Sequence, residues 1–128
     1  RHSIEFDRVF TYEPRVEKEK IISKIPQDIL TKFEFHDADE KIDLLAEIIK
    51  KASKDDYVLL KLDLGSPERD LDVIDRLLQN QNNIQDYVDE FFYAFPVPEG
   101  NLTDRFYGPW YKRFIALREA GIRAHSWV

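Results

Sequence analysis

The chain has 128 residues, of which 43% are hydrophobic and 34% charged, as in a folded globular protein. Its formal net charge of −6 argues against a nucleic-acid-binding surface, because such surfaces neutralise phosphates with Lys and Arg. No apolar run reaches the roughly 18 to 20 residues that cross a bilayer, and the absence of cysteine excludes disulfides and thiolate chemistry. We expect a single soluble domain over residues 1–128, with no nucleic-acid partner and no membrane span.

Strand-like and helical segments alternate from the start of the chain. Ile, Phe, Val and Tyr dominate residues 4–12, which predicts a strand ended by Glu13-Pro14, since proline cannot continue a ladder. A helical segment over 15–25 is stopped by Pro26. The segment KFEFHDADE (32–40) is typical of a short strand that runs into acids.

The middle of the chain predicts a helix, a buried strand and another helix. Residues 40–53 place apolar side chains on one helical face, and Asp39 can cap this helix. The run YVLLKLDL (57–64) is typical of a central parallel strand covered on both faces. Ser66-Pro67-Glu68 then offers an N-cap serine, a first-turn proline and an acid, and the helix continues to about Gln79.

The last part of the chain continues the alternation. A polar break, QNQNN, precedes a predicted strand at 87–95. A long loop leads to a helix over 110–120 that ends at Gly121, and residues 122–128 form the closing strand. The whole pattern predicts an α/β fold with a mostly parallel sheet.

Acidic residues follow three of the predicted strands, namely Glu13, Asp37 with Asp39, and Asp63. Ligands of doubly wound sheets bind outside the carboxyl ends of the strands, although each acid alone could equally cap the next helix. Glu13 is placed to accept hydrogen bonds from ribose hydroxyls, a role that follows a glycine-rich turn. No G-x-G-x-x-G turn occurs in the 128 residues. The chain also lacks methionine and begins close to a strand, which suggests a processed chain or a fragment.

Two segments carry a family resemblance. VFTYEP (9–14) and KLDLGSPERDLDVI (61–74) resemble FkbM-type and related methyltransferase-like proteins, which have a strand ending in FEP and a later KIDVEGAE or KLDIDTPE strand-turn-helix. VDEFFYAF (88–95) and LREAGIRAHSWV (117–128) look like later strands of the same group. The resemblance spans most of the chain from the family's second strand onward. It implies a Rossmann-like S-adenosylmethionine-dependent methyltransferase fold that lacks its first strand.

The resemblance also implies roles for four acids. Glu13 matches the ribose-binding acid and Asp37 the acidic loop beside the adenine, while Asp63 and Glu68 match the acids near the acceptor. Two departures count against activity: the glycine-rich turn is absent, and residues 94–96 read Ala-Phe-Pro where the family often has an acid and a histidine. Methyl transfer cannot proceed without a bound donor.

Two functions therefore stay open. The chain is either the carboxyl-terminal portion of a catalytic fold, or an inactive methyltransferase remnant that serves as a structural or interaction subunit. In the doubly wound order 3-2-1-4-5, the first strand lies between the second and the fourth, so its loss leaves a gap or changes the pairing. Because unpaired edges are unstable, we expect an upstream segment or a partner protein to complete the sheet.

Three further groups have simpler interpretations. His36, Asp37 and Asp39 are too few for a metal site, which needs several convergent ligands, so we expect a solvated loop and no metal. Ser66 precedes a proline as a cap and has no G-x-S-x-G elbow, which excludes a nucleophilic serine. The aromatic segment 105–114 is either core packing or a partner-binding surface.

Overall fold

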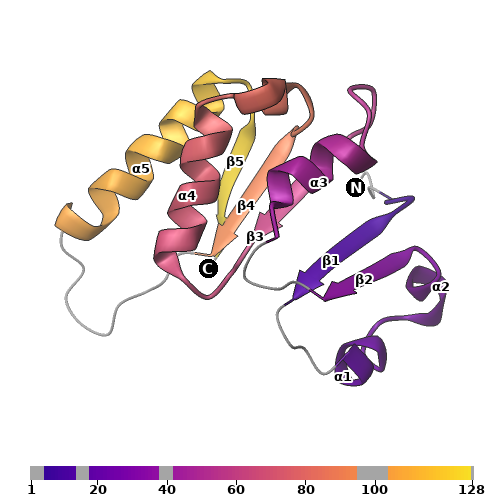
Figure 1. Ribbon diagram of the computed structural model, residues 1–128. Helices are drawn as coiled ribbons and strands as arrows, with labels where there is room; N and C mark the ends of the chain where they lie inside the picture. The colour runs from indigo at the N-terminus through magenta and orange to yellow at the C-terminus, as the bar shows by residue number, and fades with distance from the viewer. Residues whose placement is uncertain (1–4, 14–17, 38–41, 95–103, 128) are drawn as a thin grey trace. The chain divides into compact units, whose positions relative to one another are not determined.

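A computed structural model describes residues 5–13, 18–37, 42–94 and 104–127 (Figure 1). Its strands are β1 (Val9–Glu13), β2 (Phe33–Asp37), β3 (Leu59–Leu62), β4 (Glu90–Ala94) and β5 (Arg123–Trp127). Its helices are α1 (Lys18–Ile22), α2 (Gln27–Leu30), α3 (Leu44–Lys51), α4 (Pro67–Leu78), the 3-10 helix η1 (Gln81–Asp86) and α5 (Asp104–Glu119). All the strand pairs in these ranges are parallel, which confirms the predicted α/β class.

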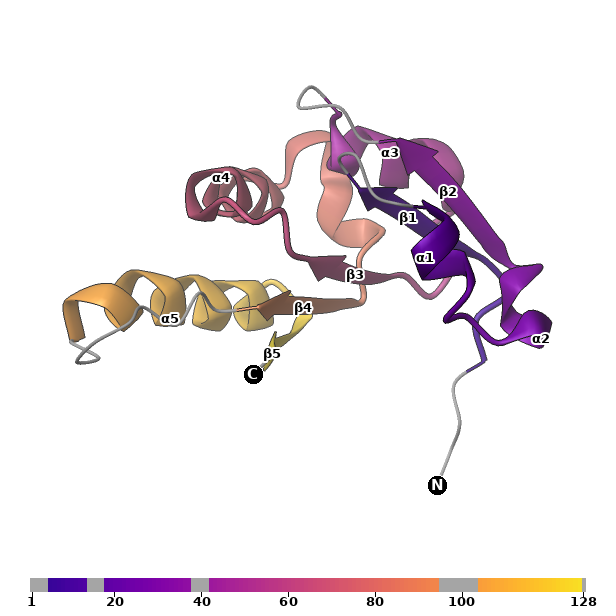
Figure 2. The same ribbon diagram turned by 90° about the horizontal axis from the view of Figure 1, so that it is seen from below.

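The chain divides into two compact units, residues 1–42 and 43–128, and each contains its own sheet. The first unit holds the two-stranded sheet β1-β2, and the second holds the three-stranded sheet β3-β4-β5, and the strands of each sheet are labelled in Figure 2. Parallel strands joined by helices are compatible with a Rossmann-like topology. That one domain spans 1–128 stays a prediction.

The first unit is a short βαβ segment. Its strands pair in register from Val9↔Phe33 to Glu13↔Asp37. The predicted helix over 15–25 is shorter in the structure, where α1 covers only Lys18–Ile22. Pro26 was expected to stop a helix, but it precedes α2 and its carbonyl accepts from the N–H groups of that helix. Proline is tolerated there because the first turn of a helix does not use its missing N–H.

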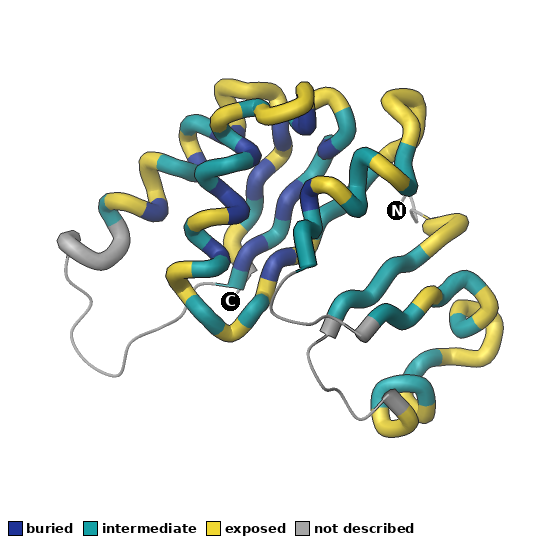
Figure 3. Tube along the Cα trace, viewed as in Figure 1, coloured by how far each residue is buried: buried dark blue, intermediate teal, exposed yellow. Residues whose placement is uncertain are grey.

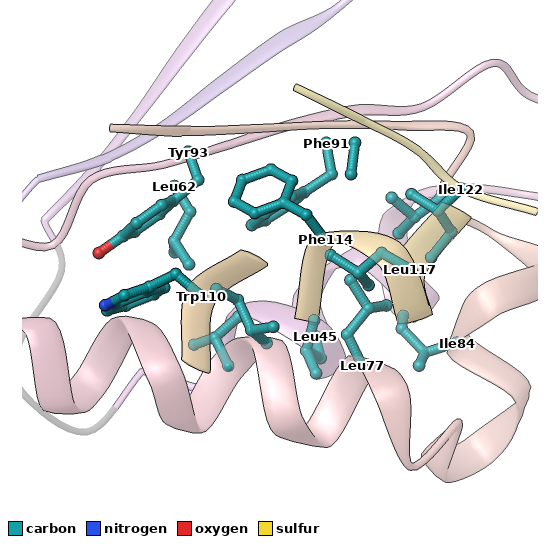
Figure 4. Packing of buried hydrophobic residues seen from close by; sticks show 14 residues of the cluster. Leu45, Leu62, Leu77, Ile84, Phe91, Tyr93, Trp110, Phe114, Leu117 and Ile122 are labelled. Carbon is teal, nitrogen blue, oxygen red and sulfur yellow. The ribbon is translucent and has the colours of Figure 1, made fainter. Parts of the chain in front are cut away.

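The second unit contains the hydrophobic core. Figure 3 shows the buried positions concentrated along β4 and the helices of this unit. Phe91 and Tyr93 alternate with half-buried residues along β4 and point to the helices, as Figure 4 shows. Leu45 of α3 and Leu77 of α4 belong to the same cluster. Trp110 of α5 also lies in this cluster, so within the aromatic segment it is a core residue.

The α5 helix ends as its glycine predicts. Gly121 has a φ of +92°, its N–H donates to the Arg118 carbonyl at 3.0 Å, and the Ile122 N–H donates to the Leu117 carbonyl at 3.0 Å. This pair of hydrogen bonds is the Schellman motif, in which glycine is favoured because it has no Cβ. The start of the helix was predicted wrongly, because α5 begins at Asp104 rather than Trp110 and contains Pro109.

Three local predictions in the second unit need correction. The residue at the N-cap of α3 is Asp43, whose carboxylate accepts from the Ala46 N–H at 3.2 Å; the predicted cap, Asp39, lies outside the described residues. Ser66 occupies the N-cap position of α4, but its side chain makes no capping hydrogen bond. β3 was expected to be central, yet among the described strands it pairs with β4 alone, and Lys61 is exposed.

None of the helices that the structure describes is both long and apolar enough to cross a bilayer.

Candidate functional site

Each of the two acids predicted to bind the cofactor is the last residue of a strand, and the two strands are neighbours. Glu13 is the last residue of β1, Asp37 is the last residue of β2, and the register pairs them directly. Parallel strands lie roughly 4.8 Å apart, so the backbone places these residues side by side at the carboxyl edge of the sheet. Their side chains lie outside the described part of the structure.

One residue before this edge, an aromatic pair crosses the same two strands. The rings of Tyr12 and His36 stack with their centroids 4.8 Å apart. His36 Nε2 also lies 3.6 Å from a carboxylate oxygen of Glu34, at ion-pair distance when the imidazole is protonated. The Tyr12–His36 stack joins the two strands that carry the acidic edge, whereas the contact between His36 and Glu34 lies within β2.

The two acids predicted to lie near the acceptor flank a tight turn in the second unit. Asp63 follows the last residue of β3, and Glu68 is the second residue of α4; both are exposed. Gly65, with a φ of +66°, turns the chain between them. An exposed carboxylate at the carboxyl end of a strand is available to accept hydrogen bonds from a ligand.

A further acid beside this turn, Asp70, was not predicted from the sequence. It is the only charged residue buried among the described positions, with 4% of its surface exposed. Its carboxylate accepts from the Leu64 N–H at 3.1 Å and from the Tyr93 hydroxyl at 3.4 Å. Burial raises the pKa of the Asp70 carboxyl above its ordinary value, and the nearby negative charge of Asp63 adds to this rise.

A signal for Asp70 was present in the helix pattern. Asp70 lies four residues before Ile74 and seven before Leu77, and both of these are buried. Residues at these spacings share one face of a helix, so Asp70 occupies a core-facing position. An acid in an otherwise apolar stripe is the feature that could have been recognised from sequence.

Tyr93 connects this acid to the core. Its ring stacks on Trp110 with centroids 4.7 Å apart, as Figure 4 shows. Burial, followed by the negative charge of Asp70, raises the pKa of the Tyr93 hydroxyl, so this group stays protonated and acts as a donor. The next residue, Ala94, ends β4 and brings no functional group to the carboxyl edge.

A second polar cluster lies at the opposite, amino-terminal end of the same sheet. Glu90, the first residue of β4, accepts a hydrogen bond from the Tyr57 hydroxyl, which in turn accepts from Arg123 Nη2 at 2.8 Å. The hydrogen bond from Tyr57 lowers the pKa of Glu90. His125 Nε2 lies 2.8 Å from Glu90 Oε1 without hydrogen-bond geometry, so the contact is ionic when His125 is protonated. The cluster joins the ends of β4 and β5.

Among the described residues, no group of three His, Cys, Asp or Glu side chains could hold a metal ion. The proposed solvated loop at His36, Asp37 and Asp39 lies partly outside those residues, so its interpretation stays a prediction.

The chain matches no family model, and no curated protein or solved structure is significantly similar to it.

Proposed function

We propose that this chain is an S-adenosylmethionine-dependent methyltransferase-like domain and forms the carboxyl-terminal portion of the catalytic fold. Glu13 and Asp37 would bind the nucleoside of the donor, and the acceptor would approach Asp63 and Glu68. The proposal rests mainly on the register that pairs Glu13 with Asp37 at the carboxyl ends of two parallel strands. This is the edge at which doubly wound folds bind nucleotides.

The chemistry of the paired acids fits this ligand. A carboxylate is an acceptor with two oxygens, and a ribose offers neighbouring hydroxyl donors. The Glu13 carboxylate can therefore accept from both hydroxyls, and Asp37 on the adjoining strand would lie beside the adenine. Hydrogen bonds to charged groups contribute about 1.5 to 3 kcal/mol each. When bound, the donor would supply an electrophilic methyl group, so the protein would need chiefly to align it with the acceptor.

The strand neighbours support the same proposal. β2 pairs with β1, and β4 lies between β3 and β5. A doubly wound sheet keeps these neighbours when its first strand is left out. The glycine-rich segment that contacts the donor would come from residues outside this chain's 128, either upstream or on a partner protein.

A second candidate function is an inactive remnant that acts as a structural or interaction subunit. One observation favours it: β4 ends in Ala94, a residue without catalytic chemistry, at the edge where the family often carries an acid and a histidine. This candidate predicts stable co-purification with a partner protein and no donor binding.

Calorimetry with S-adenosylhomocysteine tests the proposal on the complete native protein. We expect saturable binding that the substitution Glu13→Gln weakens at least about tenfold, because a charge-assisted hydrogen bond is lost. Glu34→Gln, on the same sheet but away from its carboxyl edge, is the matched control and should bind normally. Absence of binding at millimolar ligand would contradict the proposal, and a co-purifying partner in that case would favour the second candidate.

A further inference from the structure

We propose that Asp70 is a positioning residue that fixes the turn carrying Asp63 and Glu68. The assignment deepens the proposed function and rests on it for the identity of the ligand. Its basis is the geometry between the end of β3 and the start of α4.

Asp70 holds the turn at two points. Its carboxylate accepts from the Leu64 N–H at 3.1 Å, and its own N–H donates to the Ser66 carbonyl at 3.0 Å. The Leu64 N–H belongs to the peptide group that joins Leu64 to Asp63. The first bond therefore fixes the peptide plane next to Asp63, and the second fixes the entry into α4.

The sheet does not fix this peptide. β3 ends at Leu62, so the ladder with β4 stops at the Leu62↔Tyr93 pair. Beyond it, Gly65 adopts a positive φ, a conformation that glycine enters and leaves with little steric cost. Without the Asp70 carboxylate, the segment from Asp63 to Ser66 would sample several conformations.

The core in turn holds Asp70. The Tyr93 hydroxyl donates to its second oxygen at 3.4 Å, which is longer than the roughly 2.7 to 2.8 Å of a strong O–H···O bond. This bond therefore contributes less than the one to Leu64. The Tyr93 ring is stacked on Trp110, so Asp70 links an exposed turn to rigid parts of β4 and α5.

A carboxylate at this place destabilises the fold relative to a neutral group, because a buried charge loses its hydration. A neutral amide of the same shape can still accept from the Leu64 N–H through its oxygen. Asp70→Asn therefore preserves the positioning bond, whereas Asp70→Ala removes it. Comparing the two variants separates the loss of the positioning hydrogen bond from the loss of the negative charge.

The test measures exchange of the Leu64 amide hydrogen by NMR in the complete native protein. In Asp70→Ala we expect Leu64 to exchange at least about tenfold faster, because the ordered turn is then populated only in part. Asp70→Asn should restore the exchange rate to within about threefold of the native protein. Asp72→Ala, which removes an exposed acid on the same helix, is the control and should not change the rate.

The possible results separate the two proposals. Native exchange at Leu64 in Asp70→Ala would overturn the positioning role, as would failure of Asp70→Asn to restore it. If the native protein binds no S-adenosylhomocysteine, the proposed function fails, and the role of Asp70 in ordering the turn is decided by exchange and its rescue alone. Should Asp70→Ala fail to fold, Asp70→Ser, whose shorter side chain cannot reach Leu64, replaces it.

Discussion

The two units of this chain contain similar elements but differ in how much they bury. In residues 43–128, alternate positions of β4 and one face each of α4 and α5 form a continuous core. In residues 1–42, no described side chain is buried, although Phe33 and Phe35 stack with centroids 5.5 Å apart. Isolated two-stranded sheets are marginal in water. A strand pattern that matches that of a buried sheet therefore does not by itself provide a core.

Separating the two units gives the largest expected difference in stability. Residues 43–128 alone should unfold cooperatively in urea, because the entire buried cluster lies within them. Residues 1–42 alone should show no cooperative transition, since their sheet has two strands and no buried centre. Circular dichroism during urea titration measures both. A folded 1–42 fragment, or an unfolded 43–128 fragment, would contradict the comparison.

Matched Phe→Ala substitutions measure the difference in burial between the two units at single residues. Phe91→Ala, at a fully buried position of β4, should lower the unfolding free energy by about 3 to 5 kcal/mol through lost burial and a new cavity. Phe35→Ala, at a half-buried position of β2, should cost less than half as much. Urea denaturation of the full chain provides both values. Equal losses would mean that the first unit is as well packed as the second.

A smaller effect is expected at the end of α5. Gly121→Ala should destabilise the chain by about 1 kcal/mol, because an alanine at a φ of +92° is strained. Gly121→Asn should destabilise it less, since asparagine tolerates the left-handed region better. Thermal denaturation can rank the two variants. Equal stability of Gly121→Ala and the native chain would rule out a required positive φ.

The smallest predicted effect is a pH dependence from Asp70. Its pKa is raised in the folded state, so the folded state binds a proton more readily than the unfolded one. The unfolding free energy contributed by this group therefore falls as pH rises from its unfolded pKa through its folded pKa, the opposite of a salt-bridged acid. Relative to the native chain, Asp70→Asn should gain stability across that interval. A difference between them that does not change with pH would contradict the raised pKa.

The sequence predicted the elements of the second unit better than those of the first. The α4 helix was placed correctly because an N-terminal proline and apolar residues at helical spacing agree. The length of helix α1 was overestimated, because charged residues of high helix propensity extend beyond the segment that forms the helix. The start of α5 was missed because Pro109 and Gly108 indicate a loop, yet the helix includes both.

Of the candidate site, only the acids at the ends of strands could be predicted from the sequence. Periodicity located Glu13, Asp37 and Asp63 at the carboxyl ends of strands, and the register then showed that the first two are partners. The core-facing position of Asp70 could be read from the helical spacing, but its contact with Tyr93, a residue 23 positions away in the chain, could not. Polar contacts between residues this far apart in the chain depend on tertiary packing, which the periodicity of the sequence does not encode.

Photo-crosslinking of isotope-labelled S-adenosylmethionine to the complete native protein, with mass-spectrometric mapping of the labelled peptides, measures whether the donor binds at the proposed place. The proposed function predicts saturable labelling at the carboxyl ends of β1 and β2 or at the turn of residues 63–68, and loss of that labelling in excess S-adenosylhomocysteine. Labelling confined to other segments, or no saturable labelling at all, would contradict it.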